Sequence, residues 1–130
     1  MKLFIMQLNN ITGEIIDAAI EVHKTLGPGL LESVYEKALK RELELRGLKA
    51  DNQQPVEVVY KGVNVADDLR LDMIVEDKVI VELKSVEELK EVHYKQLQTY
   101  LRLLDKRVGL LINFNVVLLK NGIHRVVNNF

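Results

Sequence analysis

Two short runs decide the fold: Leu71-Asp72-Met73-Ile74-Val75 and Val79-Ile80-Val81-Glu82-Leu83-Lys84. Each run is apolar enough to form a buried β-strand. The pair nevertheless carries two carboxylates and an ammonium group, which a buried strand holds only where they meet a metal ion, a charged partner or water. Glu82 and Lys84 are two residues apart, so both side chains project from the same face of their strand.

The loop between the two strands decides whether the carboxylates share a face. A three-residue loop of residues 76–78 sets Asp72 directly across from Glu82. A two-residue turn with regular pairing puts the carboxylates on opposite faces unless one strand carries a bulge. Regular alternation also predicts one apolar face that carries Leu71, Met73 and Val75.

Convergent carboxylates would make a site for a hard metal ion. Two carboxylates and a main-chain carbonyl are oxygen ligands suited to Mg²⁺ or Mn²⁺. Lys84, beside that ion, would orient a water molecule or neutralise charge on a phosphate. The alternative is a cross-strand salt bridge between Lys84 and Asp72 on a solvated face, and the pattern by itself leaves both readings open.

Length and composition set the class of protein. The 130 residues suffice for one domain, residues 1–130, with a core of its own. The absence of Cys excludes disulfides, thiolate metal sites and thiol nucleophiles. An apolar stretch at the N-terminus is cut short by Gln7, Asn9 and Asn10, so we expect no signal peptide, no membrane partner and a cytoplasmic protein.

The charge balance leaves nucleic-acid binding to local features. With 18 basic and 19 acidic side chains the net charge is −1, which gives no global attraction to phosphate. Lys95, Arg102 and Lys106 recur along a predicted helix and could contact a phosphate backbone, although a solvated helix face is the simpler explanation.

Hydrophobic periodicity predicts three helices. Residues 11–26 form the first, with Thr12 as its N-cap, and Gly27-Pro28-Gly29 ends it. Residues 30–46 form the second, with Leu31, Val34 and Tyr35 directed toward the core. Residues 92–105 form the third.

A period of two predicts the strands. Residues 55–60 and 63–65 flank a Lys61-Gly62 turn, and residues 69–76 and 79–83 form the next pair. Residues 108–113 and 116–119 follow the third helix, and Asn121-Gly122 predicts a hairpin that returns residues 124–127 onto 116–119. The order ααββββαβββ predicts an α/β fold with a mixed central sheet flanked by helices.

Three more residues lie on the predicted helices at positions that could face the strand pair. Glu32 is near the start of the second helix, where a carboxylate also complements the helix dipole. Gln96 and Tyr100 are one turn apart on the third helix, where by themselves they are more simply explained as residues at the edge of the core.

Together these residues resemble a known family. Gly29-x-x-Glu32-x-x-Tyr35 resembles the namesake motif of the GxxExxY proteins, a group within the PD-(D/E)XK nuclease superfamily. The sequential motifs of the superfamily's RecB-type branch are matched by Asp72, Glu82-Leu83-Lys84 and Gln96-x-x-x-Tyr100. One departure is Leu71, which stands where the superfamily's name has proline.

The resemblance implies a restriction-endonuclease-like αβββαβ core and a nuclease site. Asp72 and Glu82 would be metal ligands together with the Leu83 carbonyl, and Lys84 would be the catalytic lysine. Glu32 would reach the same Mg²⁺ or Mn²⁺ directly or through water, and Gln96 and Tyr100 would position the substrate or Lys84.

The leading hypothesis is a magnesium-dependent hydrolase that cleaves nucleic-acid phosphodiester bonds, with DNA as the favoured substrate. The alternative is a catalytically silent module of the same fold that binds nucleic acid or a protein partner. A third reading, a scaffold with a solvated charged strand face, leaves Glu32, Gln96 and Tyr100 as coincidences.

Overall fold

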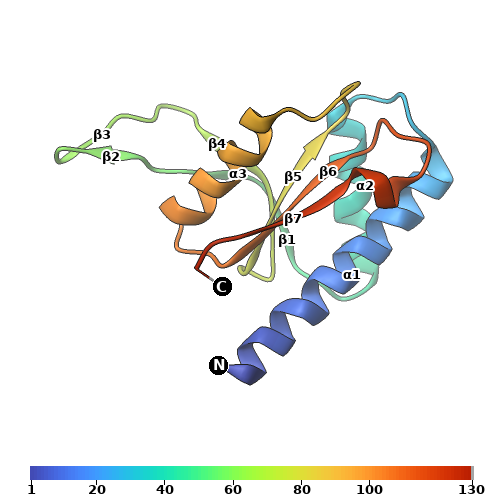
Figure 1. Cartoon of the computed structure of the whole chain (residues 1–130), viewed down its shortest axis with the longest axis horizontal. Helices are drawn as coiled ribbons and strands as arrows, with labels where there is room; N and C mark the ends of the chain where they lie inside the picture. Colours follow the sequence, from blue (N-terminus) through green and yellow to red (C-terminus); the bar gives the residue numbers. More distant parts are fainter. Residues whose placement is uncertain (130) are drawn as a thin grey trace.

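A mixed five-stranded sheet carries helices on both faces (Figure 1). The computed structural model describes residues 1–129. Its elements are α1 (Lys2–Leu26), α2 (Glu32–Leu45), β1 (Ala50–Pro55), β2 (Val59–Tyr60), β3 (Val63–Asn64), β4 (Arg70–Val75), β5 (Val79–Lys84), α3 (Glu91–Leu103), β6 (Val108–Asn113), the 3-10 helix η1 (Leu119–Gly122) and β7 (Ile123–Val127).

The strand order β1-β4-β5-β6-β7 confirms the predicted α/β class with a mixed sheet. All neighbours pair antiparallel except β5 and β6, which are parallel because α3 crosses between them. The succession α2-β1-β4-β5-α3-β6 is the expected αβββαβ core, consistent with a restriction-endonuclease-like fold. The β2–β3 hairpin forms a separate two-stranded arm that projects from the sheet in Figure 1.

Two apolar clusters hold the layers together. The first joins α1 and α2 to one face of the sheet and includes Leu39, Leu43 and Val81. The second joins α3 to the other face and includes Leu97, Leu101 and Ile80. Both are built from Leu, Val and Ile with few aromatic side chains, and the sheet is therefore buried on both faces.

Two glycines allow close packing around β6. A Cβ atom at Gly109 would lie 2.8 Å from Leu97 Cδ1, so glycine lets α3 approach the sheet. A Cβ atom at Gly122 would lie 2.2 Å from the main-chain oxygen of Asn113. Gly122 is therefore required for close backbone contact, and it lies within η1.

The prediction of a C-terminal hairpin between residues 116–119 and 124–127 is wrong. Residues 116–119 do not form a strand, and η1 occupies the position of the predicted Asn121-Gly122 turn. Strand β7 pairs with β6 instead, with His124 opposite Leu111. The turn signal failed because Val117 and Leu118 are exposed and offer no buried strand for β7 to pair with.

The first two helices also differ from expectation in detail. Helix α1 begins at Lys2, so Thr12 is not its N-cap; inside the helix the Thr12 hydroxyl donates to the main-chain oxygen of Asn9 at 3.0 Å. Leu31 and Val34 were expected in the core but are exposed, because α2 turns Tyr35, Leu39 and Leu43 toward the sheet.

The first predicted strand was also misplaced. Residues 50–55 form β1, an edge strand paired with β4, while the hairpin around Lys61-Gly62 forms but is shorter than expected. The sequence Asp-Asn-Gln-Gln has low β-propensity, and pairing with the well-defined strand β4 imposes the extended conformation.

Candidate active site

The register of β4 and β5 brings the two carboxylates opposite each other. The ladder pairs Val75 with Val79 and Met73 with Val81. A three-residue loop therefore connects the strands, as predicted, and its first two residues have positive φ angles of 53° and 54°. Continued by one step, this register places Asp72 across from Glu82.

At that step, side chains replace the backbone ladder. The Asp72 N–H donates to Glu82 Oε2 at 2.9 Å, and the Leu83 N–H donates to Asp72 Oδ2 at 2.8 Å. In each carboxylate, one oxygen accepts a backbone hydrogen bond and the other oxygen takes no part in these two bonds. The strand ends therefore present two fixed carboxylates side by side.

The strand faces change at the same place. Met73 and Val75 pack in the cluster with α1 and α2, whereas Leu71 packs in the cluster with α3. The expectation of a common face for these three residues is wrong, because the regular pairing of β4 with β5 ends at Met73.

Burial makes the carboxylate pair electrostatically costly. Glu82 is 4 % exposed, and burial, followed by the charge of Asp72, raises the pKa of its carboxyl to about 8. Burial is also the main cause of the raised pKa of Asp72, opposed by the hydrogen bond from Leu83 and the charge of Lys84. A buried and a half-buried carboxylate that face each other ionise together more readily when a cation compensates their charges.

Lys84 lies close enough to act on both acids but does not neutralise them in an ion pair. Its positive charge lowers the pKa of Asp72 and of Glu82. Among residues 1–129, the ion pairs do not include Lys84. The cross-strand salt bridge with Asp72 that the sequence allowed is therefore not formed.

Glu32 reaches this end of the sheet from the start of α2. The Ser85 N–H donates to Glu32 Oε2 at 3.4 Å, and the Ser85 hydroxyl donates to the main-chain oxygen of Leu30 at 2.6 Å. These bonds join the first turn of α2 to the residue that follows Lys84. Glu32 itself is exposed, and its negative charge raises the pKa of Asp72.

Tyr35 anchors the segment that carries Glu32. Its ring is fully buried and stacks on Phe114, with ring centroids 4.4 Å apart and planes 9° apart. Its hydroxyl donates to the main-chain oxygen of Gly27 at 2.5 Å and accepts from the Leu30 N–H at 3.1 Å. One side chain thus fixes both the turn before α2 and the beginning of the helix.

Helix α3 contributes Tyr100 and Gln96. The Gln96 side-chain amide donates to the Tyr100 hydroxyl at 3.2 Å. Burial, followed by the charges of Glu82 and Asp72, raises the pKa of Tyr100, so the phenol lies near the carboxylate pair. A surface groove of about 540 Å³ runs along this helix, lined by Val92, His93, Lys95, Gln96, Thr99 and Tyr100.

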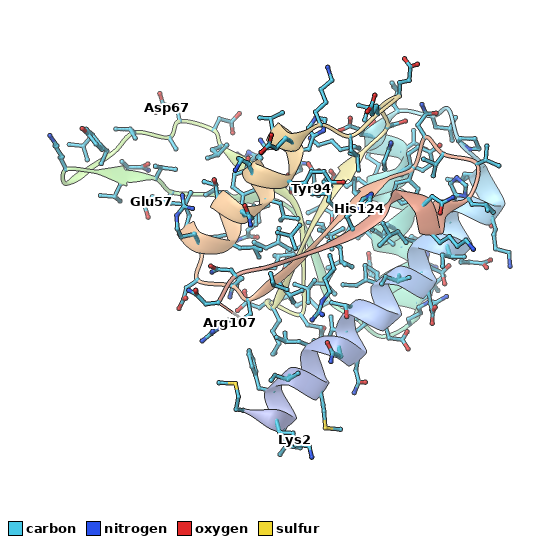
Figure 2. The ribbon with its side chains drawn as sticks, viewed as in Figure 1. Lys2, Glu57, Asp67, Tyr94, Arg107 and His124 are labelled. Atoms are coloured by element: carbon cyan, nitrogen blue, oxygen red, sulfur yellow. The ribbon has the colours of Figure 1, made fainter. Side chains whose placement is uncertain are left out.

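Near its start, α3 also contacts β7. The rings of Tyr94 and His124 meet edge to face, with centroids 5.4 Å apart (Figure 2). The basic stripe predicted on this helix is partly neutralised, since Lys95 pairs with Glu91 and Lys106 pairs with Asp77.

Glu36 is a residue of this region that the sequence reasoning missed. Its negative charge raises the pKa of both Asp72 and Glu82. Its side chain accepts hydrogen bonds from Asn52 and Gln53 of β1. The one sequence signal was its position four residues after Glu32, which puts both carboxylates on the same helix face.

Residues 1–129 lack two further features. No three His, Cys, Asp or Glu side chains lie together as a metal-binding group in this part of the chain. None of its helices is long and apolar enough to cross a membrane.

The sequence matches a known protein family. A family model described as the PD-(D/E)XK nuclease superfamily matches residues 9–126, which include all the candidate site residues. Neither the curated proteins nor the solved structures that were searched gave a match.

Proposed function

Because the chain belongs to the PD-(D/E)XK nuclease superfamily, we propose that it is a metal-dependent nuclease that hydrolyses phosphodiester bonds in DNA. The observation that carries the proposal is the convergence of Asp72 and Glu82 beside Lys84. Burial and mutual repulsion raise the pKa of Glu82 to about 8, which is the electrostatic condition of a site that needs a cation.

The donor set fits Mg²⁺ or Mn²⁺. Asp72 and Glu82 would each supply the carboxylate oxygen that accepts no backbone hydrogen bond. The Leu83 carbonyl would add a third ligand, and Glu32 would bind the ion directly or through water. A bound divalent ion would polarise a phosphate oxygen and lower the pKa of a water molecule.

The chain's own side chains would hold and orient the substrate. The Lys84 ammonium group, which no ion pair of residues 1–129 occupies, would contact a phosphate oxygen or the attacking water. The Gln96–Tyr100 pair at the edge of the α3 groove would position Lys84 or the nucleotide.

We further propose membership of the GxxExxY group within the RecB-type branch, as one nuclease-like domain over residues 1–130 in the cytoplasm. The packing supports the motif physically. Gly29 has a φ of 96°, which favours glycine, and the Tyr35 hydroxyl fixes the turn before the helix. Glu32, between them in the motif, is thereby oriented toward Ser85 at the strand end.

The test is cleavage of DNA and RNA by the purified chain with Mg²⁺, Mn²⁺ or a chelator. We expect metal-dependent DNA cleavage that falls at least about 100-fold in Glu82→Ala and in Lys84→Ala, since each removes a charged group from the reaction. Asp77→Asn and Lys78→Ala, at the other end of the β4–β5 hairpin, are matched controls that should cleave normally. Circular dichroism checks that all four variants remain folded.

Failure of the wild type to bind either metal ion, with both nucleic acids left intact, would contradict the proposal. The near-neutral charge favours one alternative, a silent module that binds nucleic acid or a protein. Salt-dependent DNA binding that persists in Glu82→Ala without cleavage would support that alternative, because a purely electrostatic contact does not need the carboxylate.

A further inference from the structure

Glu36 is a carboxylate near the proposed site to which the proposed mechanism gives no role. It lies on α2 one helical turn after Glu32, so the two side chains share a face of the helix. It is half-buried, and its charge acts on both Asp72 and Glu82.

Both carboxylate oxygens of Glu36 bond to the neighbouring strand. Oε2 accepts from the Asn52 side-chain amide at 3.2 Å, and Oε1 accepts from the Gln53 side-chain amide at 2.7 Å. The Asn52 amide also lies 3.5 Å from the main-chain oxygen of Glu36. Three contacts therefore join this turn of α2 to β1.

The partners of Glu36 stand beside Asp72 in the sheet. Asn52 pairs with Met73, and the register of β1 with β4 puts Gln53 opposite Asp72. Gln53 has a φ of 54°, so the edge strand leaves regular geometry at this position. Glu36 thus bonds to β1 beside the point where the regular β4–β5 pairing ends and the two carboxylates begin.

We infer that Glu36 is a positioning residue of the proposed active site. It fixes the N-terminal half of α2, and with it Glu32, at the level of Asp72. Its negative charge also strengthens the attraction of the Asp72–Glu82 pair for a divalent cation. The inference rests on the proposed function, because it assigns Glu36 to the cation site of that reaction.

The experiment measures binding of Mn²⁺ alone to the full chain by electron paramagnetic resonance. Glu36→Gln keeps the shape of the side chain but removes its charge, and should weaken Mn²⁺ binding by about tenfold. Gln53→Leu leaves the charge of Glu36 in place but removes the hydrogen bond that Glu36 accepts from β1. This change should weaken Mn²⁺ binding by about threefold. Glu42→Gln, on the same helix but paired with Arg46, is the matched control and should bind within about twofold of wild type.

Thermal unfolding of the same variants separates positioning from general destabilisation. We expect Glu42→Gln and Gln53→Leu to lower the melting temperature similarly, while only Gln53→Leu loses affinity for Mn²⁺. If Glu36→Gln does not fold, the comparison of Gln53→Leu with Glu42→Gln tests the inference: Mn²⁺ affinity that falls equally in both variants, or in neither, would overturn it.

Wild-type affinity in Glu36→Gln, or an equal loss in Glu42→Gln, would overturn the role of Glu36 and leave the proposed function standing. A wild-type chain that binds no Mn²⁺ would overturn the proposed function, and the inference with it.

Discussion

The two ends of the β4–β5 hairpin are built from the same strands but serve opposite purposes. At the loop end, Val75 and Val79 are fully buried and pair through a regular backbone ladder. At the other end the ladder stops, and two N–H groups bond to the carboxylates of Asp72 and Glu82 instead. The comparison shows that one short hairpin can supply the core at one end and a charged site at the other.

The two ends should also differ in what they contribute to stability. Burial of valines in the core stabilises the fold by removing apolar surface from water. Burial of Glu82 raises the free energy of its ionised form, as its raised pKa shows. We therefore expect the carboxylate end to lower the stability of the metal-free protein at neutral pH, which is typical of functional sites.

The largest expected effect is a pH dependence that arises at the carboxylate end. Because the pKa of Glu82 rises from its ordinary 4.5 to about 8 in the folded chain, the folded state binds this proton more tightly than the unfolded state. The stabilisation of the folded state by protonated Glu82 is therefore complete below about pH 4.5 and is lost as the pH rises toward 8. Between these two values the free energy of unfolding should fall by about 1.4 kcal/mol per pH unit.

Urea unfolding of metal-free protein between about pH 5 and 8 measures this loss. Glu82→Gln should remove most of the decline and be more stable than wild type near pH 8, and saturating Mg²⁺ should restore the wild type. The same decline in wild type and Glu82→Gln would place its origin elsewhere in the chain.

A core substitution at the loop end tests whether the two ends of the β4–β5 hairpin act independently. Val79→Ala removes two buried methyl groups and should lower the free energy of unfolding by about 2–3 kcal/mol. Chemical denaturation gives this value, and Mn²⁺ affinity at a temperature where the variant is folded should match wild type. A large loss of Mn²⁺ affinity in folded Val79→Ala would show that the two ends are not independent.

The smallest expected effect comes from the anchor of α2. Tyr35→Phe keeps the stack on Phe114 but removes the hydroxyl that joins Gly27 to Leu30, and should cost about 1 kcal/mol in unfolding free energy. Cleavage should fall only a few-fold, because Glu32 keeps its carboxylate but loses part of its support. Stability equal to wild type would show that the turn holds without this bond.

Local sequence patterns were enough to predict the chemical content of the hairpin. The three-residue loop put Asp72 across from Glu82, in agreement with the observed pairing of Met73 with Val81 and Val75 with Val79. Alternation along the strand predicts that Glu82 and Lys84 share a face. The order of the predicted helices and strands also predicted the mixed α/β class, and the order of the motifs predicted the superfamily, because both depend on local patterns that can be read without knowledge of packing.

Long-range packing, by contrast, determines which distant segments meet. Strand β7 pairs with β6, and Asn121-Gly122 forms part of η1, because the available partner strand outweighs a local turn preference. Glu36 reaches the carboxylate pair through β1, whose residues carry little sign of a strand. Local patterns set which face a side chain takes, but its neighbours across the sheet depend on how the whole chain packs.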